Sequence, residues 1–273
     1  MQEEKSVLRE RAGIFAIYLV VLFINAFVDL GHKIIVQNTI FVIYDEQTQL
    51  ILTPILNAMV LIPFVLLFTL SGYLSDKFAK PHIMRWSAFA AVLITLAITY
   101  CYYQGAYISA FGFTLLLATQ SAIYSPAKYG YIRECLKKAG LSIGNAYVSA
   151  VTLTAILLGT VFFSYLFELY LGVKQYSTPQ EILLHIAPVG WVLVGLSMVE
   201  FLATFGVRFY ATKFSEVKLS VQKLITLHYL MNNIRVIKGN QIIWFSIWGT
   251  AIFWGMSQNL VAVIPALAKV NLG

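Results

Sequence analysis

The sequence predicts an all-α integral membrane protein, and three observations lead to this fold class. Of the 273 residues, 59% are hydrophobic and only 11% are charged, whereas a soluble domain carries about 25% charged residues. The apolar residues form runs long enough to cross a bilayer, for which about 20 helical residues suffice. The lysines and arginines gather in the connections between these runs. Together these observations exclude soluble enzymes, secreted scaffolds and disordered tails.

Seven apolar runs have the length of a membrane span, and charged or turn-forming residues separate them. They cover residues 13–42, 50–71, 83–103, 108–124, 145–171, 187–207 and 242–268. Each run is expected to be helical, because lipid offers no partner for an unpaired backbone group. None shows the period-two alternation of a barrel strand. The first run is expected to be retained, since no small-residue cleavage site follows it.

The connection between the sixth and seventh runs is much longer than the others and contains a helical stretch at 217–231. We therefore expect three parts: a six-helix bundle at 1–207, a basic cytoplasmic interdomain loop at 208–241, and a seventh helix at 242–273 that begins a second bundle. This order suits the first half of a transporter built from two parallel six-helix repeats. The rest of the second bundle is expected to lie outside this sequence.

The orientation follows from the basic residues, which in membrane proteins mark cytoplasmic loops. All but three of the 19 lysines and arginines lie before the first run, or in or within three residues of the second-to-third, fourth-to-fifth and sixth-to-seventh connections. The exceptions are Lys33, Lys174 and Lys269. The amino terminus is therefore expected in the cytoplasm, and the net charge of +7 indicates topology rather than nucleic-acid binding.

No cofactor, metal or catalytic centre is expected. Cys101 and Cys135 are separated by a full span, which predicts no disulfide, and neither has metal-ligand spacing. The chain lacks the G-x-x-x-x-G-K-[ST] loop that binds ATP. Residues 140–144 fit the hydrolase pattern G-x-S-x-G, but that motif needs a preceding strand and a sharp turn, whereas this stretch leads from a basic loop into a helix. We expect no enzyme activity.

Residues 72–80, GYLSDKFAK, stand between the second and third runs. They resemble the cytoplasmic G-x-L-a-D-r-x-G-r-k signature of the major facilitator superfamily, with Ala79 in place of the second glycine. The resemblance implies that Gly72, Asp76, Lys77 and Lys80 hold the cytoplasmic side shut. Gly72 would allow two helices to approach closely, and Asp76 would cap a helix amino end and pair with a basic residue. The alternative is an ordinary basic loop that only sets topology.

Residues 122–130, AIYSPAKYG, end the fourth run. They closely resemble the Y-S-P-A-K-Y-G segment of bacterial lysophospholipid transporters. The resemblance implies a protein of the major facilitator fold in the bacterial inner membrane. Among the membrane lipids, this protein would move lysophospholipid, chiefly lysophosphatidylethanolamine, inward across the membrane. It also implies an acyltransferase and an acyl-carrier-protein ligase as partners or fused domains, although no H-x-x-x-x-D signature occurs here. Two alternatives stay open: a membrane anchor for such enzymes, and a facilitator for an unrelated small solute.

Three polar residues share one face of the first run, because they are spaced four apart: Asn25, Asp29 and Lys33. Charges in hydrocarbon are costly and mark functional sites. We expect this stripe to line the substrate cavity, with Asp29 receiving the ammonium of an ethanolamine head group or a coupling proton. The alternative is that Lys33 reaches the outer interface and merely neutralises Asp29.

Three further polar residues are candidates in later runs. Lys128 follows Pro126, which is expected to open a turn at the end of the fourth run, and the lysine is expected to attract the lipid phosphodiester. Its alternative is contact with lipid head groups. Gln120 is expected to bond to another helix or line the cavity. Glu200 lies near the bilayer centre, either as a proton site or as a structural tie between helices.

Overall fold

The computed structural model describes residues 2–172, 174, 176–210, 228–253 and 255–256. The chain divides into two compact units, Met1–Val217 and Lys218–Gly273, which are treated separately below.

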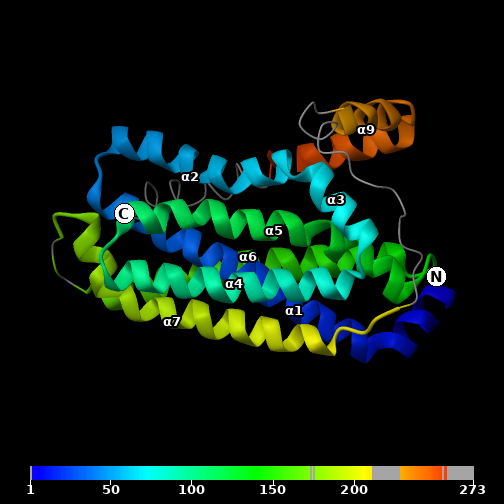
Figure 1. Ribbon diagram of the computed structural model, residues 1–273, viewed down its shortest axis with the longest axis horizontal. Coiled ribbons are helices and arrows are strands. Elements are labelled where there is room, and N and C mark those ends of the chain that lie inside the picture. Colours follow the sequence, from blue (N-terminus) through cyan, green and yellow to red (C-terminus); the bar gives the residue numbers. More distant parts are fainter. Residues whose placement is uncertain (1, 173, 175, 211–227, 254, 257–273) are drawn as a thin grey trace, which may run out of the picture. The chain divides into compact units, whose positions relative to one another are not determined.

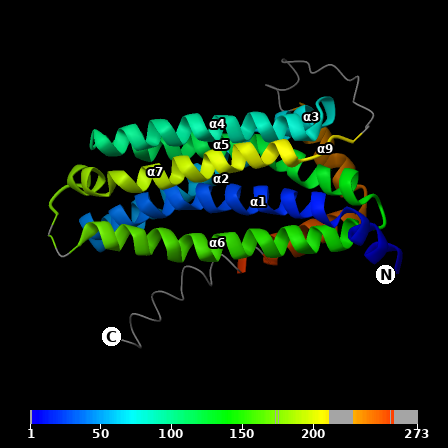
Figure 2. The same ribbon diagram turned by 90° about the horizontal axis from the view of Figure 1, so that it is seen from below.

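Every regular element described in the first unit is a helix, and the long helices α1, α4, α5, α6 and α7 lie side by side with their long axes roughly aligned (Figures 1 and 2). In chain order they are α1 (Gln2–Ile43), α2 (Glu46–Leu66), α3 (Phe68–Lys77), α4 (Lys80–Tyr103), α5 (Tyr107–Leu136), α6 (Leu141–Leu171), α7 (Pro179–Ala203) and the short 3₁₀ helix η1 (Thr204–Gly206). Within the described residues, six helices are long and apolar enough to cross a membrane. The all-α membrane fold is therefore confirmed, and it is consistent with the major facilitator type.

The second expected span, 50–71, is divided in two. Asp45 begins α2 by accepting a hydrogen bond from the Gln47 amide, and a further bond from Thr48 lowers the pKa of Asp45. The helix ends at Leu66, and Leu67, with φ −92° and ψ 1°, separates it from α3. Pro63 lies in the last turn of α2 and cannot donate a backbone hydrogen bond. The sequence showed the apolar run but not this break.

The fourth expected span, 108–124, was too short. Helix α5 runs from Tyr107 to Leu136 and contains Pro126, so the helix does not end near this proline. The polar residues that follow the apolar run do not end the helix, because the side chain of Lys128 is buried among other helices. Hydropathy measures preference for lipid, and this side chain does not face it.

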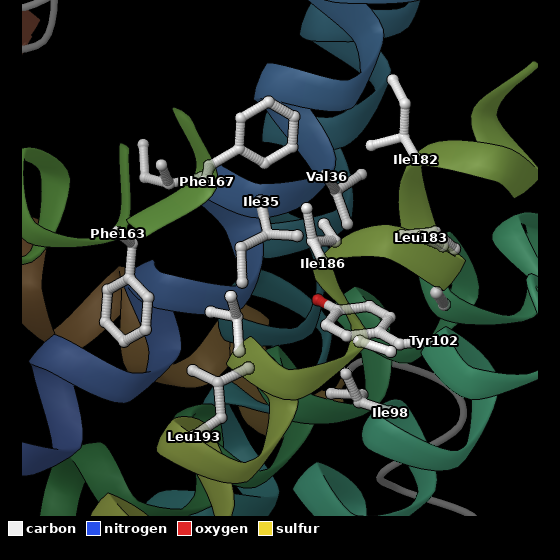
Figure 3. Packing of buried hydrophobic residues seen from close by; sticks show 14 of the residues in the cluster. Ile35, Val36, Ile98, Tyr102, Phe163, Phe167, Ile182, Leu183, Ile186 and Leu193 are labelled. Carbon is white, nitrogen blue, oxygen red and sulfur yellow. The ribbon is translucent and has the colours of Figure 1, made fainter. Parts of the chain in front are cut away.

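The core of the first unit consists of two hydrophobic clusters. Figure 3 shows one of them, in which Ile35 and Val36 of α1, Tyr102 of α4 and Phe163 and Phe167 of α6 meet residues of α7. The other contains Tyr18 and Leu22 of α1, Met84 of α4, Tyr131 of α5 and Val148 of α6. These aromatic and branched side chains join α1 to its neighbours along its length.

One glycine lets α1 and α6 approach closely. A Cβ atom at Gly31 would lie 2.4 Å from the buried ring of Phe163. Small residues at such crossings are typical of helix packing in membranes.

The second unit contains the helices α9 (His228–Lys238) and Gln241–Phe253. The latter begins the expected seventh span, whose residues 254 and 257–268 lie outside the described part of the chain. Most of the helical stretch expected at 217–231 lies outside it as well.

Candidate functional site

A chain of polar contacts links α1, α5 and α4 inside the bundle. The hydroxyl of Ser121 on α5 is hydrogen-bonded to Asp29 Oδ2 on α1 and lies 2.9 Å from Gln120 Oε1. Gln120 Nε2 then donates to the backbone carbonyl of Ser87 on α4, at 3.0 Å. Gln120 therefore does bond to another helix. Ser121 was not foreseen as a partner of Asp29, because a serine in an apolar run carries no signal of its own.

Lys128 lies inside the same bundle rather than at a helix end. Its side chain is 9% exposed. The Nζ atom lies 3.4 Å from Thr152 Oγ1 of α6 and 5.3 Å from the centre of the Tyr129 ring. The backbone carbonyl of Lys128 accepts a hydrogen bond of 2.6 Å from the Tyr18 hydroxyl of α1. Lys128 and Asp29 are close enough to interact electrostatically, although the described residues show no ion pair between them. Helices α1 and α5 therefore bring an acidic and a basic side chain near each other within the bundle.

Lys33 does not take part in this pair. Within the described residues, no ion pair joins it to Asp29, and its side chain is half-buried one turn further along α1. The interpretation in which Lys33 neutralises Asp29 finds no contact to support it.

Glu200 of α7 is fully buried, and neither of its carboxyl oxygens has a hydrogen-bond partner. It interacts electrostatically with Asp29. Asn25 of α1 lies beside the Glu200 carboxyl, and the two roles expected for Glu200, a proton site and a tie between helices, stay predictions. Asn25 Nδ2 and Asp29 Oδ1 on α1 also lack partners, so these three residues leave polar atoms unpaired in the interior.

A cavity of about 520 Å³ adjoins this polar chain between α3, α4 and α5. Its walls are mostly apolar, and Ser87 and Gln120 are its link to the polar chain. Its lining residues are Leu74, Phe78, His82, Ile83, Trp86, Ser87, Ala90, Gln120 and Ile123. The volume is in the range of about 300–1,000 Å³ that is usual for ligand pockets. Sequence reasoning missed the cavity, because its walls come from three helices distant along the chain.

The four residues of the expected cytoplasmic gate differ in the contacts that they make. Among the described residues, a Cβ atom at Gly72 would meet nothing within 4 Å. Asp76 is exposed, and α4 begins after Ala79 with no side-chain cap from the described residues, so the roles expected for Gly72 and Asp76 stay predictions. Lys77 lies over the Tyr73 ring, at 5.3 Å.

Only Lys80 of these four joins the loop to the bundle. It forms an ion pair with Glu134 of α5, and both side chains are largely buried. Its methylene groups cross Gly130, where a Cβ atom would lie 2.3 Å from Lys80 Cε. The loop motif 72–80 and the segment 122–130 therefore touch, and the close approach occurs at Gly130 rather than Gly72.

A buried histidine was also missed. His32 of α1 has Nε2 3.0 Å from the Ala110 carbonyl and Nδ1 2.8 Å from the Tyr102 hydroxyl. A carbonyl only accepts, so Nε2 carries the hydrogen and Tyr102 donates to Nδ1. Thr114 Oγ1 lies 3.2 Å from Nε2. This neutral, fully paired histidine ties α1 to α4 and α5, and a lone histidine in an apolar run gives no sign of such a role.

Comparisons with known proteins agree with the motif at 122–130. No family model matches the chain, and no solved structure matches it. The chain is 32% identical over 136 residues to the lysophospholipid transporter LplT of Yersinia enterocolitica, covering 48% of this chain and 30% of that protein. It is 32% identical over 118 residues to the lysophospholipid transporter LplT of Escherichia coli K12, covering 43% and 27%. The matches thus span less than a third of these relatives' length, and they confirm that this chain resembles bacterial lysophospholipid transporters.

Proposed function

We propose that this chain is the first part of a transporter that moves lysophospholipid, of the lysophosphatidylethanolamine kind, across the bacterial inner membrane by alternating access. The six-helix bundle at 1–207 would rock against a second bundle that begins at 242–273, with the basic loop at 208–241 between them. The observation that carries the proposal is that the buried Lys128 and the partly buried Asp29 lie near each other among apolar helices. A membrane protein places such charges where a polar substrate must pass.

The two charges match the two ends of a zwitterionic head group. Lys128 is a compact cation that suits the phosphodiester, and Asp29 suits the ammonium. Asn25 and Gln120 supply amide groups beside them, and Lys33 lies one turn away on α1. When the head group binds, Lys128 pairs with the lipid phosphodiester and Asp29 pairs with the lipid ammonium. No charge is then left unpaired in a medium of low dielectric constant.

The apolar cavity supplies a place for the single acyl chain, because Gln120 belongs both to its wall and to the polar chain that ends at Asp29. A lipid with one chain needs one such cavity. Gly72, Asp76, Lys77 and Lys80 are proposed to close the cytoplasmic side, with the Lys80–Glu134 pair as the contact between loop and bundle. An acyltransferase and an acyl-carrier-protein ligase, as partners or fused domains, would act on the delivered lipid.

The test uses the full-length protein in spheroplasts that lack their own transporter and receive labelled lysophosphatidylethanolamine from outside. Wild type is expected to take up lipid, and Asp29→Ala and Lys128→Gln are expected to lose this uptake at equal protein levels. Absence of wild-type uptake, with inserted and abundant protein, would leave an anchor or a facilitator of another solute. Unchanged uptake by Asp29→Ala would remove Asp29 from the site.

The proposed site for the acyl chain is tested by filling the cavity. Ala90→Phe places a ring in the cavity, whereas Ala97→Phe, two turns along the same helix, places one outside its lining. We expect Ala90→Phe to reduce uptake of the long-chain lipid and Ala97→Phe to leave it near wild type. Equal uptake in the two variants would place the acyl chain elsewhere.

A further inference from the structure

Polar atoms without partners gather at one place in the bundle. In the described part of the chain, seven buried side-chain nitrogen or oxygen atoms lack a hydrogen bond. Five of them belong to four residues on three adjacent helices: Asn25 and Asp29 of α1, Tyr124 of α5, and Glu200 of α7. Buried polar groups are nearly always paired, so a concentration of exceptions requires an explanation.

These four residues face one another. Asn25 and Asp29 are one helical turn apart on α1 and therefore share a face. Tyr124 interacts electrostatically with both Asp29 and Glu200, and Asn25 lies beside the Glu200 carboxyl without reaching hydrogen-bond geometry. Asn25, Tyr124 and Glu200 are at most 5% exposed, and Asp29 is partly buried with its Oδ1 enclosed. The unpaired atoms thus lie in one region of the bundle interior.

The charges at this point do not balance. Asp29 and Glu200 are two carboxyl groups, and Lys128 is the one cation among the described residues that interacts with Asp29. Glu200 interacts with Asp29 and with no cation. If both carboxyl groups are ionised, one negative charge remains uncompensated in the membrane interior. A lone buried charge of this kind costs several kcal/mol even after relaxation, so the structure is complete only with one further positive charge.

We propose that Asp29, Glu200, Tyr124 and Asn25 form a binding site for one monovalent cation, either a sodium ion or a proton. The unpaired Asp29 Oδ1, both Glu200 oxygens and the Tyr124 hydroxyl are oxygen ligands of the kind that hard cations prefer. The amide of Asn25 adds a fifth oxygen when it is turned, since its oxygen and nitrogen positions are assigned rather than observed.

The charges around the site also favour a monovalent ion. One added positive charge, together with Lys128, neutralises the two carboxylates. A divalent ion would leave an excess of positive charge in the same interior.

The experiment measures cation binding directly, on purified full-length protein in lipid nanodiscs and without lysophospholipid. One arm compares sodium chloride with choline chloride at equal ionic strength and fixed pH, using radioactive sodium binding and Tm. The other arm varies pH in choline chloride alone. The variants are Glu200→Gln and, as a matched control, Glu168→Gln, an exposed glutamate of α6 outside the cluster.

For sodium, we expect saturable binding and a rise in Tm in wild type and Glu168→Gln, both lost in Glu200→Gln. For a proton, we expect no response to sodium but a Tm that falls as pH rises, because the second carboxylate is then uncompensated, and Glu200→Gln removes this dependence. Wild type and Glu200→Gln that respond identically in both arms would overturn the proposal.

A second variant protects the test against misfolding of Glu200→Gln. Tyr124→Phe keeps both carboxyl groups and removes one hydroxyl ligand, so it is expected to weaken cation binding roughly threefold to tenfold. Unchanged affinity in a folded Tyr124→Phe protein would also contradict the site. Because the readout contains no lipid, failure of the cation site and failure of lipid transport are separate results.

Discussion

Single residues of the bundle show how a buried polar group is satisfied by a neighbour on another helix. His32, Gln120 and Lys128 each have a partner outside their own helix, whether a hydroxyl or a backbone carbonyl. In a lipid environment these bonds have no competition from water, so loss of one partner leaves the other unpaired. Substitutions that remove a hydroxyl therefore measure such contacts directly.

The Tyr102 hydroxyl is expected to stabilise the fold through His32. Tyr102→Phe leaves Nδ1 of the buried imidazole without a donor, which costs about 1–3 kcal/mol. The measurement is the unfolding free energy of the purified protein in detergent. Tyr103→Phe is the matched control, because this neighbouring side chain is 47% exposed and its substitution is expected to change stability by less than about 0.5 kcal/mol. A loss of equal size in both variants would contradict the role of His32.

Lys80 is expected to contribute to the free energy of unfolding, whereas Lys77 is not. Lys80→Met keeps the aliphatic chain that crosses Gly130 but leaves the largely buried Glu134 carboxylate without its cation. We expect a loss of about 1–3 kcal/mol in unfolding free energy, and little change for Lys77→Met, whose side chain is exposed. The pair would be unimportant if both variants unfolded like wild type.

Among the helices, α5 shows what hydropathy can and cannot predict. Six spans of the first unit were predicted correctly as helices, since lipid imposes length and apolarity on each. The carboxyl-terminal limit of α5 was missed because Lys128, which follows the apolar run, faces other helices rather than lipid. Asn25, Asp29, Gln120, Lys128 and Glu200 stood out as polar residues in apolar runs. Their partners, such as Ser121 and Tyr124, did not, because only the packing of helices brings them together.

Two glycines of α1 are expected to respond to alanine with opposite signs. Gly31→Ala forces a Cβ atom into the Phe163 ring, which is fully buried and cannot move aside, and such overpacking costs about 1–3 kcal/mol. Gly13→Ala meets nothing within 4 Å and is expected to stabilise the helix by about 0.5–1 kcal/mol. Thermal unfolding of both variants gives the comparison. A neutral Gly31→Ala would show that α1 and α6 do not approach closely there.

At the scale of the whole molecule, the distribution of basic residues predicts which end of the bundle faces the cytoplasm. The native thiols Cys101 and Cys135 are free and buried, so single exposed cysteines can be labelled against a silent background. We expect a membrane-impermeant maleimide to label Gln47→Cys in intact cells and Lys138→Cys only after permeabilisation. The reverse pattern would place the amino terminus outside.

The break at Leu67 has a consequence for the cavity. Leu74 and Phe78, which follow the break, form one wall, while α4 and α5 form the others. A change in the backbone angles of Leu67 would therefore change how far that wall stands from the rest. Binding of a molecule in the cavity and the tilt of α3 would then be reciprocally linked, because each changes the equilibrium of the other by the same free energy. A ligand that binds tightly would stabilise one backbone angle at Leu67, and a variant with that angle fixed would bind this ligand in preference to others.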